Sequence, residues 1–308
     1  MPRKRPGRLS GPEDDSQDEI LADDSDVLTN LNSNLTLKIG IGDIDEPSMP
    51  SSPSCVSIES NRDGVGYVNF EVISTDTVKE GRSSFVVYKL LLSGHGIEKT
   101  PGIVEKRYTD FEKFNSKLRK RFPELMENVS FPKKVLMGNL KNETIAKRSR
   151  AFEQYLNQLM AVDEIRFSNE TKKFFYEKEL HFATDLLTAK NYEEAVGLFE
   201  KCLPIQEKIM GSMNSEVIKT LCAIIASYQG IENQEKALKY SNTALLCIGE
   251  RIKDPFYLPL LHNAIYLHWM LGKEKTHLEA KLGELRDKGI STETYTNFLE
   301  TVIRELKR

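Results

Sequence analysis

A stretch of six residues, Lys106–Phe111, places two adjacent cations and a tyrosine between a predicted strand and a predicted helix. Thr109, with Glu112 three residues later, has the pattern of a helix N-cap and its capping box. The buried face of that helix is expected to hold three residues at helical spacing: Phe111, Phe114 and Leu118. Arg107 and Tyr108 therefore precede a helix N-terminus, where backbone N–H groups and the helix dipole favour an anion.

The charge of the chain is unevenly distributed. The formal net charge is −3, but residues 1–60 carry −7, residues 61–176 carry +6 and residues 177–308 carry −2. Within the middle third, the segment Lys106–Arg150 holds 13 Lys and Arg against 5 Asp and Glu. This local excess of cations around the strand–helix junction indicates a phosphorylated or otherwise anionic partner.

The N-terminal region has the composition of a disordered acidic tail, with a Ser/Pro-rich run, Pro47–Ser54, and few large apolar residues to offset chain entropy. Apolar residues between Leu28 and Ile41 are a candidate for a short partner-binding segment. No signal-peptide pattern is present, and the longest apolar run, Phe85–Leu92, is too short to span a bilayer. We therefore expect a soluble protein whose membrane contact is peripheral.

Patterns of catalysis and metal binding are lacking. The five histidines are scattered, and no Gly-rich phosphate loop, HExxH motif or paired-acid motif occurs. The four cysteines form no CxxC pair, and three of them lie in apolar helical patterns typical of buried thiols: Cys202, Cys222 and Cys247. Signatures of DNA or RNA binding are absent as well. The sequence thus argues against an enzyme, a cofactor, a metal site and a nucleic-acid partner.

Three β-rich runs precede or reach the junction: Tyr67–Ser74, Arg82–Ser93 and Gly102–Tyr108. The stretches between them, Asp76–Gly81 and Gly94–Gly102, have turn composition, so a three-stranded antiparallel meander is expected. A helix is expected over 109–122, ended by Pro123. The loop Phe131–Lys134 that follows should be extended, because proline disfavours helix at the residue before it.

A second helix is expected from Glu143 to Met160. At 100° per residue its apolar face holds Ile145, Ser149, Phe152, Leu156, Leu159 and Met160. Lys147 and Arg150 point away from this face, whereas Arg148 lies at the edge of the apolar stripe. That position favours a guanidinium directed into a groove beside the core. The alternative is a side chain that snorkels to solvent.

These motifs together resemble a phox-homology (PX) domain over roughly residues 65–176. The resemblance rests on the three strands, the Lys-Arg-Tyr-Thr-Asp-Phe junction, the Phe-Pro-Lys-Lys loop and the Arg-Ser-Arg-Ala-Phe-Glu-Gln-Tyr-Leu helix, in that order. It implies binding of phosphatidylinositol 3-phosphate, with Arg107 on the 3-phosphate and Tyr108 against the inositol ring. It also implies that Lys134 meets the 1-phosphate and that Arg148 holds the ring hydroxyls, since a guanidinium presents a planar fork to paired oxygens.

The apolar trio after Lys134 is flanked by cations: Val135, Leu136 and Met137. In the PX family such a loop dips into the bilayer, so the resemblance implies shallow insertion at this point. The alternative is that the trio folds back onto the domain.

From Glu177 onward the pattern is entirely helical. The segment Asn191–Leu203 resembles the second helix of a tetratricopeptide (TPR) repeat, and its spacing returns 42 residues later, from Ala237 to Leu245. A third, weaker unit extends over 257–286. Pro204 predicts a kink or an early end of the helix that contains it. Helical repeats of this type stack into a curved surface that binds proteins.

The combination resembles the sorting-nexin subgroup of sorting nexins 20 and 21, which pairs a PX domain with a TPR-like domain called PXB. We therefore expect a disordered tail over 1–62, an α+β PX domain over 63–178 and an all-α TPR-like domain over 179–308. The resemblance implies a peripheral adaptor on the cytoplasmic side of early endosomes, which binds phosphatidylinositol 3-phosphate, recruits protein partners and acts in protein sorting. Two alternatives stay open. The pocket binds phosphatidylinositol 4,5-bisphosphate at the plasma membrane, or the chain is mainly a TPR-like scaffold.

Overall fold

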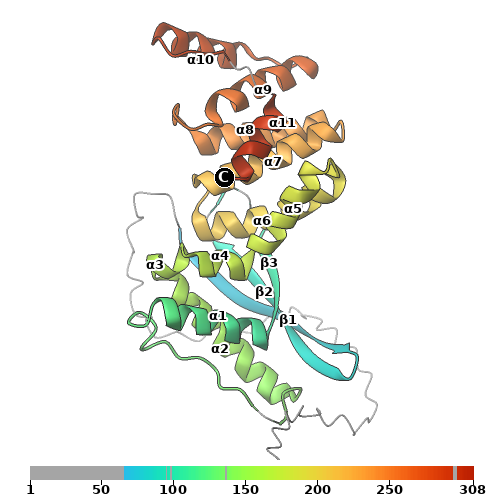
Figure 1. The fold of residues 1–308 in the computed structure, drawn as a ribbon, viewed down its shortest axis with the longest axis vertical. Helices are drawn as coiled ribbons and strands as arrows, with labels where there is room; N and C mark the ends of the chain where they lie inside the picture. Colours follow the sequence, from blue (N-terminus) through green and yellow to red (C-terminus); the bar gives the residue numbers. More distant parts are fainter. Residues whose placement is uncertain (1–65, 95, 98, 136, 294–296) are drawn as a thin grey trace, which may run out of the picture. The chain divides into compact units, whose positions relative to one another are not determined.

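The structure is a computed structural model, described here for residues 66–308 except residues 95, 98, 136 and 294–296. Its three strands lie in one antiparallel sheet in the order β1-β2-β3 (Figure 1). Their bounds are β1 Val68–Glu80, β2 Ser83–Gly94 and β3 Gly102–Arg107. The pairing of β2 with β3 is antiparallel, from Val87 opposite Arg107 to Leu92 opposite Gly102. The predicted three-stranded sheet is confirmed.

The first turn was predicted too early. Strand β1 continues to Glu80, through most of the stretch Asp76–Gly81 that has turn composition. Gly81, at φ +61°, is in the left-handed region that glycine adopts without steric cost, so the chain reverses there. In β2 the residues Val86, Tyr88, Leu90 and Leu92 are buried on one face, as the two-residue period of a strand requires.

Four helices complete the region that contains the sheet: α1 Tyr108–Arg121, α2 Asn142–Met160, α3 Asp163–Arg166 and α4 Asn169–Phe175. The predicted N-cap of α1 is wrong, because the helix begins at Tyr108 and its N-cap is Arg107. The backbone N–H of Arg107 donates to Oδ2 of Asp110 at 3.0 Å. Asp110, three residues after Arg107, thus closes the first turn of α1 in place of the predicted pair, Thr109 and Glu112.

Aromatic rings join α1, α2 and α4 into one core. The rings of Phe111 and Phe152 stack with centroids 3.8 Å apart, and those of Phe114 and Phe174 stack at 4.3 Å. Phe111, Phe114 and Leu118 are all buried, so the predicted apolar face of α1 is confirmed. Stacked and edge-to-face pairs of this kind add to the energy of simple burial.

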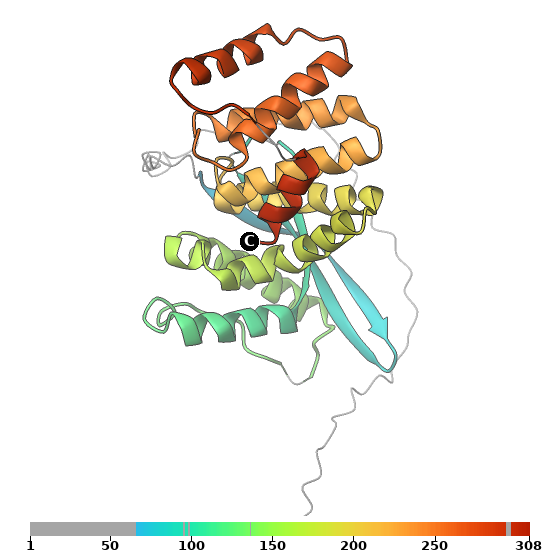
Figure 2. The same cartoon turned by 45° about the horizontal axis from the view of Figure 1, so that its top comes forward.

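Seven helices follow: α5 Glu177–Thr188, α6 Tyr192–Met210, α7 Ser215–Gly230, α8 Gln234–Ile248, α9 Tyr257–Met270, α10 Thr276–Asp287 and α11 Phe298–Leu306. Consecutive helices from α5 to α10 pack on each other, as expected for stacked helical repeats. Helix α11 was not predicted. It returns to lie on α5, α7 and α9, and Figure 2 shows it in red across α7.

Helix α6 passes through Pro204 and ends only at Met210, so the predicted early end is wrong. A proline inside a helix costs about 3 kcal/mol through its missing N–H and its steric clash. Helix α6 packs against α5, α7 and β3, and this burial outweighs that cost. Cys202, Cys222 and Cys247 are buried as predicted. Within the described part of the chain, no helix has the length and apolarity needed to cross a membrane.

Candidate functional site

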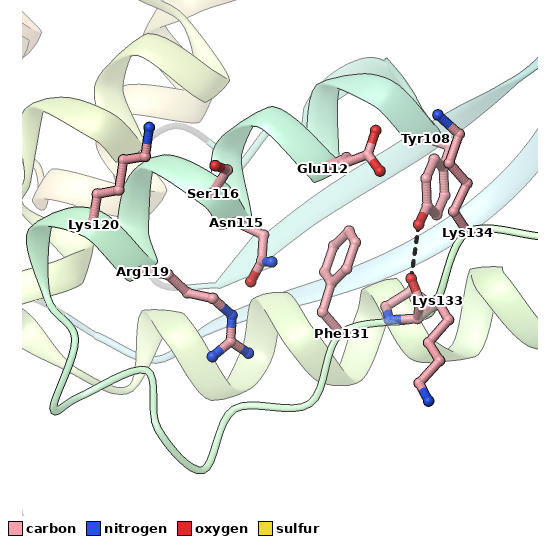
Figure 3. A pocket seen from close by; sticks show the side chains of 10 residues that line it. Tyr108, Glu112, Asn115, Ser116, Arg119, Lys120, Phe131, Lys133 and Lys134 are labelled. Carbon is pink, nitrogen blue, oxygen red and sulfur yellow. Dashed lines mark hydrogen bonds between the residues drawn. The ribbon is translucent and has the colours of Figure 1, made fainter.

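A cavity of about 510 Å³ lies between α1 and the loop that connects α1 to α2. We call it the Tyr108 cavity (Figure 3). Ten residues form its wall: Tyr108, Glu112, Asn115, Ser116, Arg119, Lys120, Phe131, Pro132, Lys133 and Lys134. Four of them are cations and one is an acid, so the cavity is suited to an anionic ligand.

Two hydrogen-bonding side chains of α1 hold the loop in place. The Tyr108 hydroxyl donates to the backbone carbonyl of Pro132 at 2.9 Å. The guanidinium of Arg119 donates to the carbonyls of Met126 at 2.8 Å and Val129 at 2.5 Å. The loop therefore has defined geometry although it contains no helix or strand between Val129 and Val135.

Arg148 lies under the ring of Tyr108. Its guanidinium carbon is 4.2 Å from the Tyr108 ring centroid, and its Nη2 donates to Oδ1 of Asn139 at 3.0 Å. The side chain is only 6% exposed, so it does not snorkel to solvent. Its buried Nε has no hydrogen-bond partner among the described residues. A buried guanidinium with an unpaired donor destabilises the folded protein, unless a ligand completes its hydrogen bonds.

Two tyrosines beside Arg148 have raised pKa values. Burial is the main cause at Tyr88, where the nearby charge of Arg148 acts in the opposite direction and lowers the pKa. Burial also raises the pKa of Tyr108, with a further increase from the Glu112 carboxylate and a decrease from Arg148. Both phenols are therefore neutral at physiological pH, and each keeps a hydroxyl proton for hydrogen bonding.

Arg107 has different neighbours. Its guanidinium carbon is 5.1 Å from the ring centroid of Phe85, and its Nε is 3.8 Å from Oδ1 of Asp110. The side chain is half-exposed and does not line the Tyr108 cavity. The structure thus places Lys134 and Arg148 beside the Tyr108 ring, whereas Arg107 lies over Phe85 of β2.

The loop after Pro132 carries the remaining predicted site residues. Lys134 lies alongside the Tyr108 ring, whereas Lys133 points away from it (Figure 3). Met137 is 86% exposed and does not fold back onto the domain, whereas Val135 is 38% exposed and partly covered. Leu136 lies outside the described residues. Insertion of the trio into a bilayer stays a prediction.

Several residues that shape the site have no recognisable signal in the sequence. Asn139 accepts the hydrogen bond from Arg148 across nine residues of chain, a contact with no periodic signal. Arg119 and Asn115 line the Tyr108 cavity from the face of α1 that the apolar pattern leaves polar. The excess of cations between Lys106 and Arg150 was the one feature that indicated such a surface.

The chain is similar in sequence to known proteins that contain a PX domain. A family model described as the PX domain matches residues 96–178. Sorting nexin-21 of Mus musculus is 34% identical over 239 residues, which is 77% of this chain and 66% of that protein. Sorting nexin-20 of Rattus norvegicus is 34% identical over 216 residues, which is 70% of this chain and 69% of that protein. The chain thus spans just under two thirds of the length of the mouse relative.

Among solved structures, a designed CISK-PX domain matches with a TM-score of 0.30 and 24% identity, covering 35% of this chain and 97% of that one. A likeness of this size carries no weight in the assignment. At 239 and 216 residues, both matches must include parts of the sheet-containing region and of the helical region. Sorting nexins are a non-enzymatic family, in agreement with the interpretation of this sequence. The chain belongs to the PX-domain sorting nexins.

Proposed function

We propose that this protein is a peripheral membrane adaptor that binds a phosphoinositide, phosphatidylinositol 3-phosphate in particular, on the cytoplasmic face of early endosomes. Its role there is endosomal protein sorting. The PX region, residues 63–178, recognises the lipid, and the helical region, residues 179–308, recruits protein partners. Each contact is weak alone, and joining them on one chain raises the effective concentration of the second.

The observation that carries the proposal is the arrangement of Arg148 and Tyr108. The guanidinium is buried and stacked on the ring at 4.2 Å, and its Nε has no hydrogen-bond partner among the residues that the structure describes. A tyrosine ring backed by a cation offers a flat surface for the inositol ring, with hydrogen-bond donors at its edge. Lys134 supplies a point charge on the same cavity wall for a phosphate.

Arg107 takes the 3-phosphate in this proposal. Its side chain is half-exposed, and its contact with Asp110 at 3.8 Å leaves guanidinium donors available. The exposed side chains of Val135 and Met137 contribute shallow insertion beside the bound headgroup.

Pelleting of the full chain with vesicles tests the proposal. Vesicles of equal net charge would carry phosphatidylinositol 3-phosphate, phosphatidylinositol 4,5-bisphosphate or phosphatidylserine alone. Binding should be strongest to the 3-phosphate lipid and should fall about tenfold or more in Arg107→Ala, because a charge-assisted phosphate contact is lost. Arg150→Ala is the matched control, since Arg150 is exposed on α2 and points away from the apolar face.

Binding that follows total lipid charge, and survives Arg107→Ala, would reduce the PX region to a basic patch. Selective binding to the 4,5-bisphosphate would instead move the site of action to the plasma membrane.

A further inference from the structure

A second cavity, of about 190 Å³, lies between α1 and α4. Eight residues line it: Lys106, Asp110, Lys113, Phe114, Lys117, Glu170, Lys173 and Phe174. We call it the lysine cavity. It holds four ammonium groups against two carboxylates, and two phenyl rings are among its walls. Nothing in the proposed function uses it.

The lysine cavity and the Tyr108 cavity use different faces of α1. The α1 residues of the Tyr108 cavity are Tyr108, Glu112, Asn115, Ser116, Arg119 and Lys120, whereas those of the lysine cavity are Asp110, Lys113, Phe114 and Lys117. At 100° per residue the centres of these two sets lie about 150° apart around the helix axis. A flat membrane that engages the Tyr108 cavity therefore cannot also reach the lysine cavity.

The four lysines of this cavity are available for contact with an anionic ligand. None of them forms an ion pair within 4.0 Å with an acid in the described part of the chain. One of the two carboxylates, Asp110, already accepts from the Arg107 backbone N–H. Lys113, Lys117 and Lys173 are exposed, so their ammonium groups can move toward a ligand.

Lys106 is the desolvated member of the set. Its ammonium lies 5.3 Å from the centroid of the Phe174 ring. Burial lowers the pKa of Lys106, although Glu179 and Asp110 raise it, and Lys178 lowers it further. A cation in this state is stabilised by a nearby anion, because the anion replaces the lost hydration.

We propose that the lysine cavity binds a soluble phosphate monoester, such as a phosphorylated side chain or a small phosphorylated metabolite. A phosphate monoester is a compact dianion, and ammonium groups serve it as point charges without a fixed hydrogen-bonding plane. The volume of the cavity admits one such group. Its position on the far face of α1 selects a soluble source over a lipid headgroup in the membrane that holds the Tyr108 cavity.

The test uses the full chain with lysine side chains labelled with ¹³C and O-phosphoserine as the probe, followed by NMR. Saturable shifts should appear at Lys106, Lys113, Lys117 and Lys173, and bound probe should raise the pKa of Lys106. The double variant Lys113→Ala/Lys117→Ala should weaken binding about tenfold or more, because two charge-assisted contacts are lost. Lys173→Ala, on α4, should weaken it in the same direction.

Lys239→Ala is the matched control, since Lys239 is an exposed lysine of α8 that lines neither the lysine cavity nor the Tyr108 cavity. It should change the affinity for O-phosphoserine less than twofold. Equal, unsaturable shifts at all exposed lysines would overturn the proposal and leave a non-specific charged surface.

A second arm separates the two sources of phosphate. Vesicles that contain phosphatidic acid, a lipid phosphate monoester, should bind the double variant as well as they bind the wild type. A loss of vesicle binding in the double variant, with O-phosphoserine binding absent, would overturn the soluble source and assign the lysines to the membrane. Binding to phosphatidylinositol 3-phosphate vesicles should be unaffected, so failure here is distinct from failure of the proposed function.

Discussion

Two arginines of the PX region, Arg166 and Arg148, are equally buried, each at 6% exposure, yet their hydrogen bonds differ. Arg166 donates through Nε to the carbonyl of Ile209 at 2.7 Å, and through Nη2 to the carbonyls of Lys208 at 2.8 Å and Gly66 at 3.1 Å. Within the described part of the chain, Arg148 makes one side-chain hydrogen bond, from Nη2 to Oδ1 of Asn139 at 3.0 Å, and its Nε has no partner.

This difference is the basis of our proposal that Arg148 binds a ligand, whereas Arg166 has a structural role. Backbone carbonyls of α6 and of the chain before β1 satisfy the fork of Arg166 inside the protein, so this side chain joins α3 to α6. The fork of Arg148 faces a tyrosine ring and an amide instead. Burial alone does not reveal function, whereas the state of the donors does.

The largest expected effect is on stability, in Arg166→Leu. This variant leaves three carbonyls without their charged donor, and we expect the free energy of unfolding to fall by about 3 kcal/mol. Denaturant unfolding measures it, with Arg150→Leu as an exposed control expected to change by less than about 0.5 kcal/mol. Binding of the folded protein to phosphoinositide vesicles should be unchanged. A selective loss of lipid binding in Arg166→Leu would remove the distinction between the two arginines.

Tyr108→Phe should have an intermediate effect. It removes the hydrogen bond to the Pro132 carbonyl but keeps the ring over Arg148. We expect vesicle binding to weaken about threefold to tenfold, because one hydrogen bond that holds the Lys134 loop is worth about 0.5–1.5 kcal/mol. Vesicle pelleting measures it, and Tyr67→Phe, a change in an exposed tyrosine, is the control. Unchanged affinity would mean that the loop does not depend on this bond.

The smallest effect is expected in Tyr88→Phe. Among the described residues the buried Tyr88 hydroxyl has no hydrogen-bond partner of normal geometry, although the Arg148 side chain beside it lowers the pKa of the phenol. Removing an unpaired polar group should leave the free energy of unfolding unchanged or raise it by up to about 1 kcal/mol. If the free energy of unfolding fell by about 1 kcal/mol or more, this hydroxyl would be a hydrogen-bond partner of Arg148. The contrast between Arg148 and Arg166 would then weaken.

The sequence predicted the framework of the fold where a residue pattern has a single physical cause. The alternating burial of β2 and the buried residues Phe111, Phe114 and Leu118 follow from the periods of strand and helix. Errors occurred where two local solutions compete. The N-cap of α1 is Arg107 and not Thr109, because the Asp110 carboxylate accepts the hydrogen bond from the Arg107 backbone N–H. Helix α6 continues through Pro204, because its tertiary packing outweighs the local cost of the proline.

The candidate site was predictable in its cations and not in its contacts. The position of Arg148 at the edge of an apolar stripe correctly indicated a buried guanidinium. Its partner Asn139, the support of the loop by Arg119 and the return of α11 onto α5, α7 and α9 depend on tertiary geometry that no periodicity encodes. The placement of Arg107 over Phe85 is of the same kind.

The most direct test of the central claim, that Arg148 is held for a lipid headgroup, is Arg148→Leu. Vesicle binding and the free energy of unfolding would be measured on the same full-length variant. We predict at least a tenfold loss of binding to phosphatidylinositol 3-phosphate vesicles, with a change in unfolding free energy below about 1 kcal/mol. Retained binding, together with a stability loss as large as that of Arg166→Leu, would contradict the account and make both arginines structural.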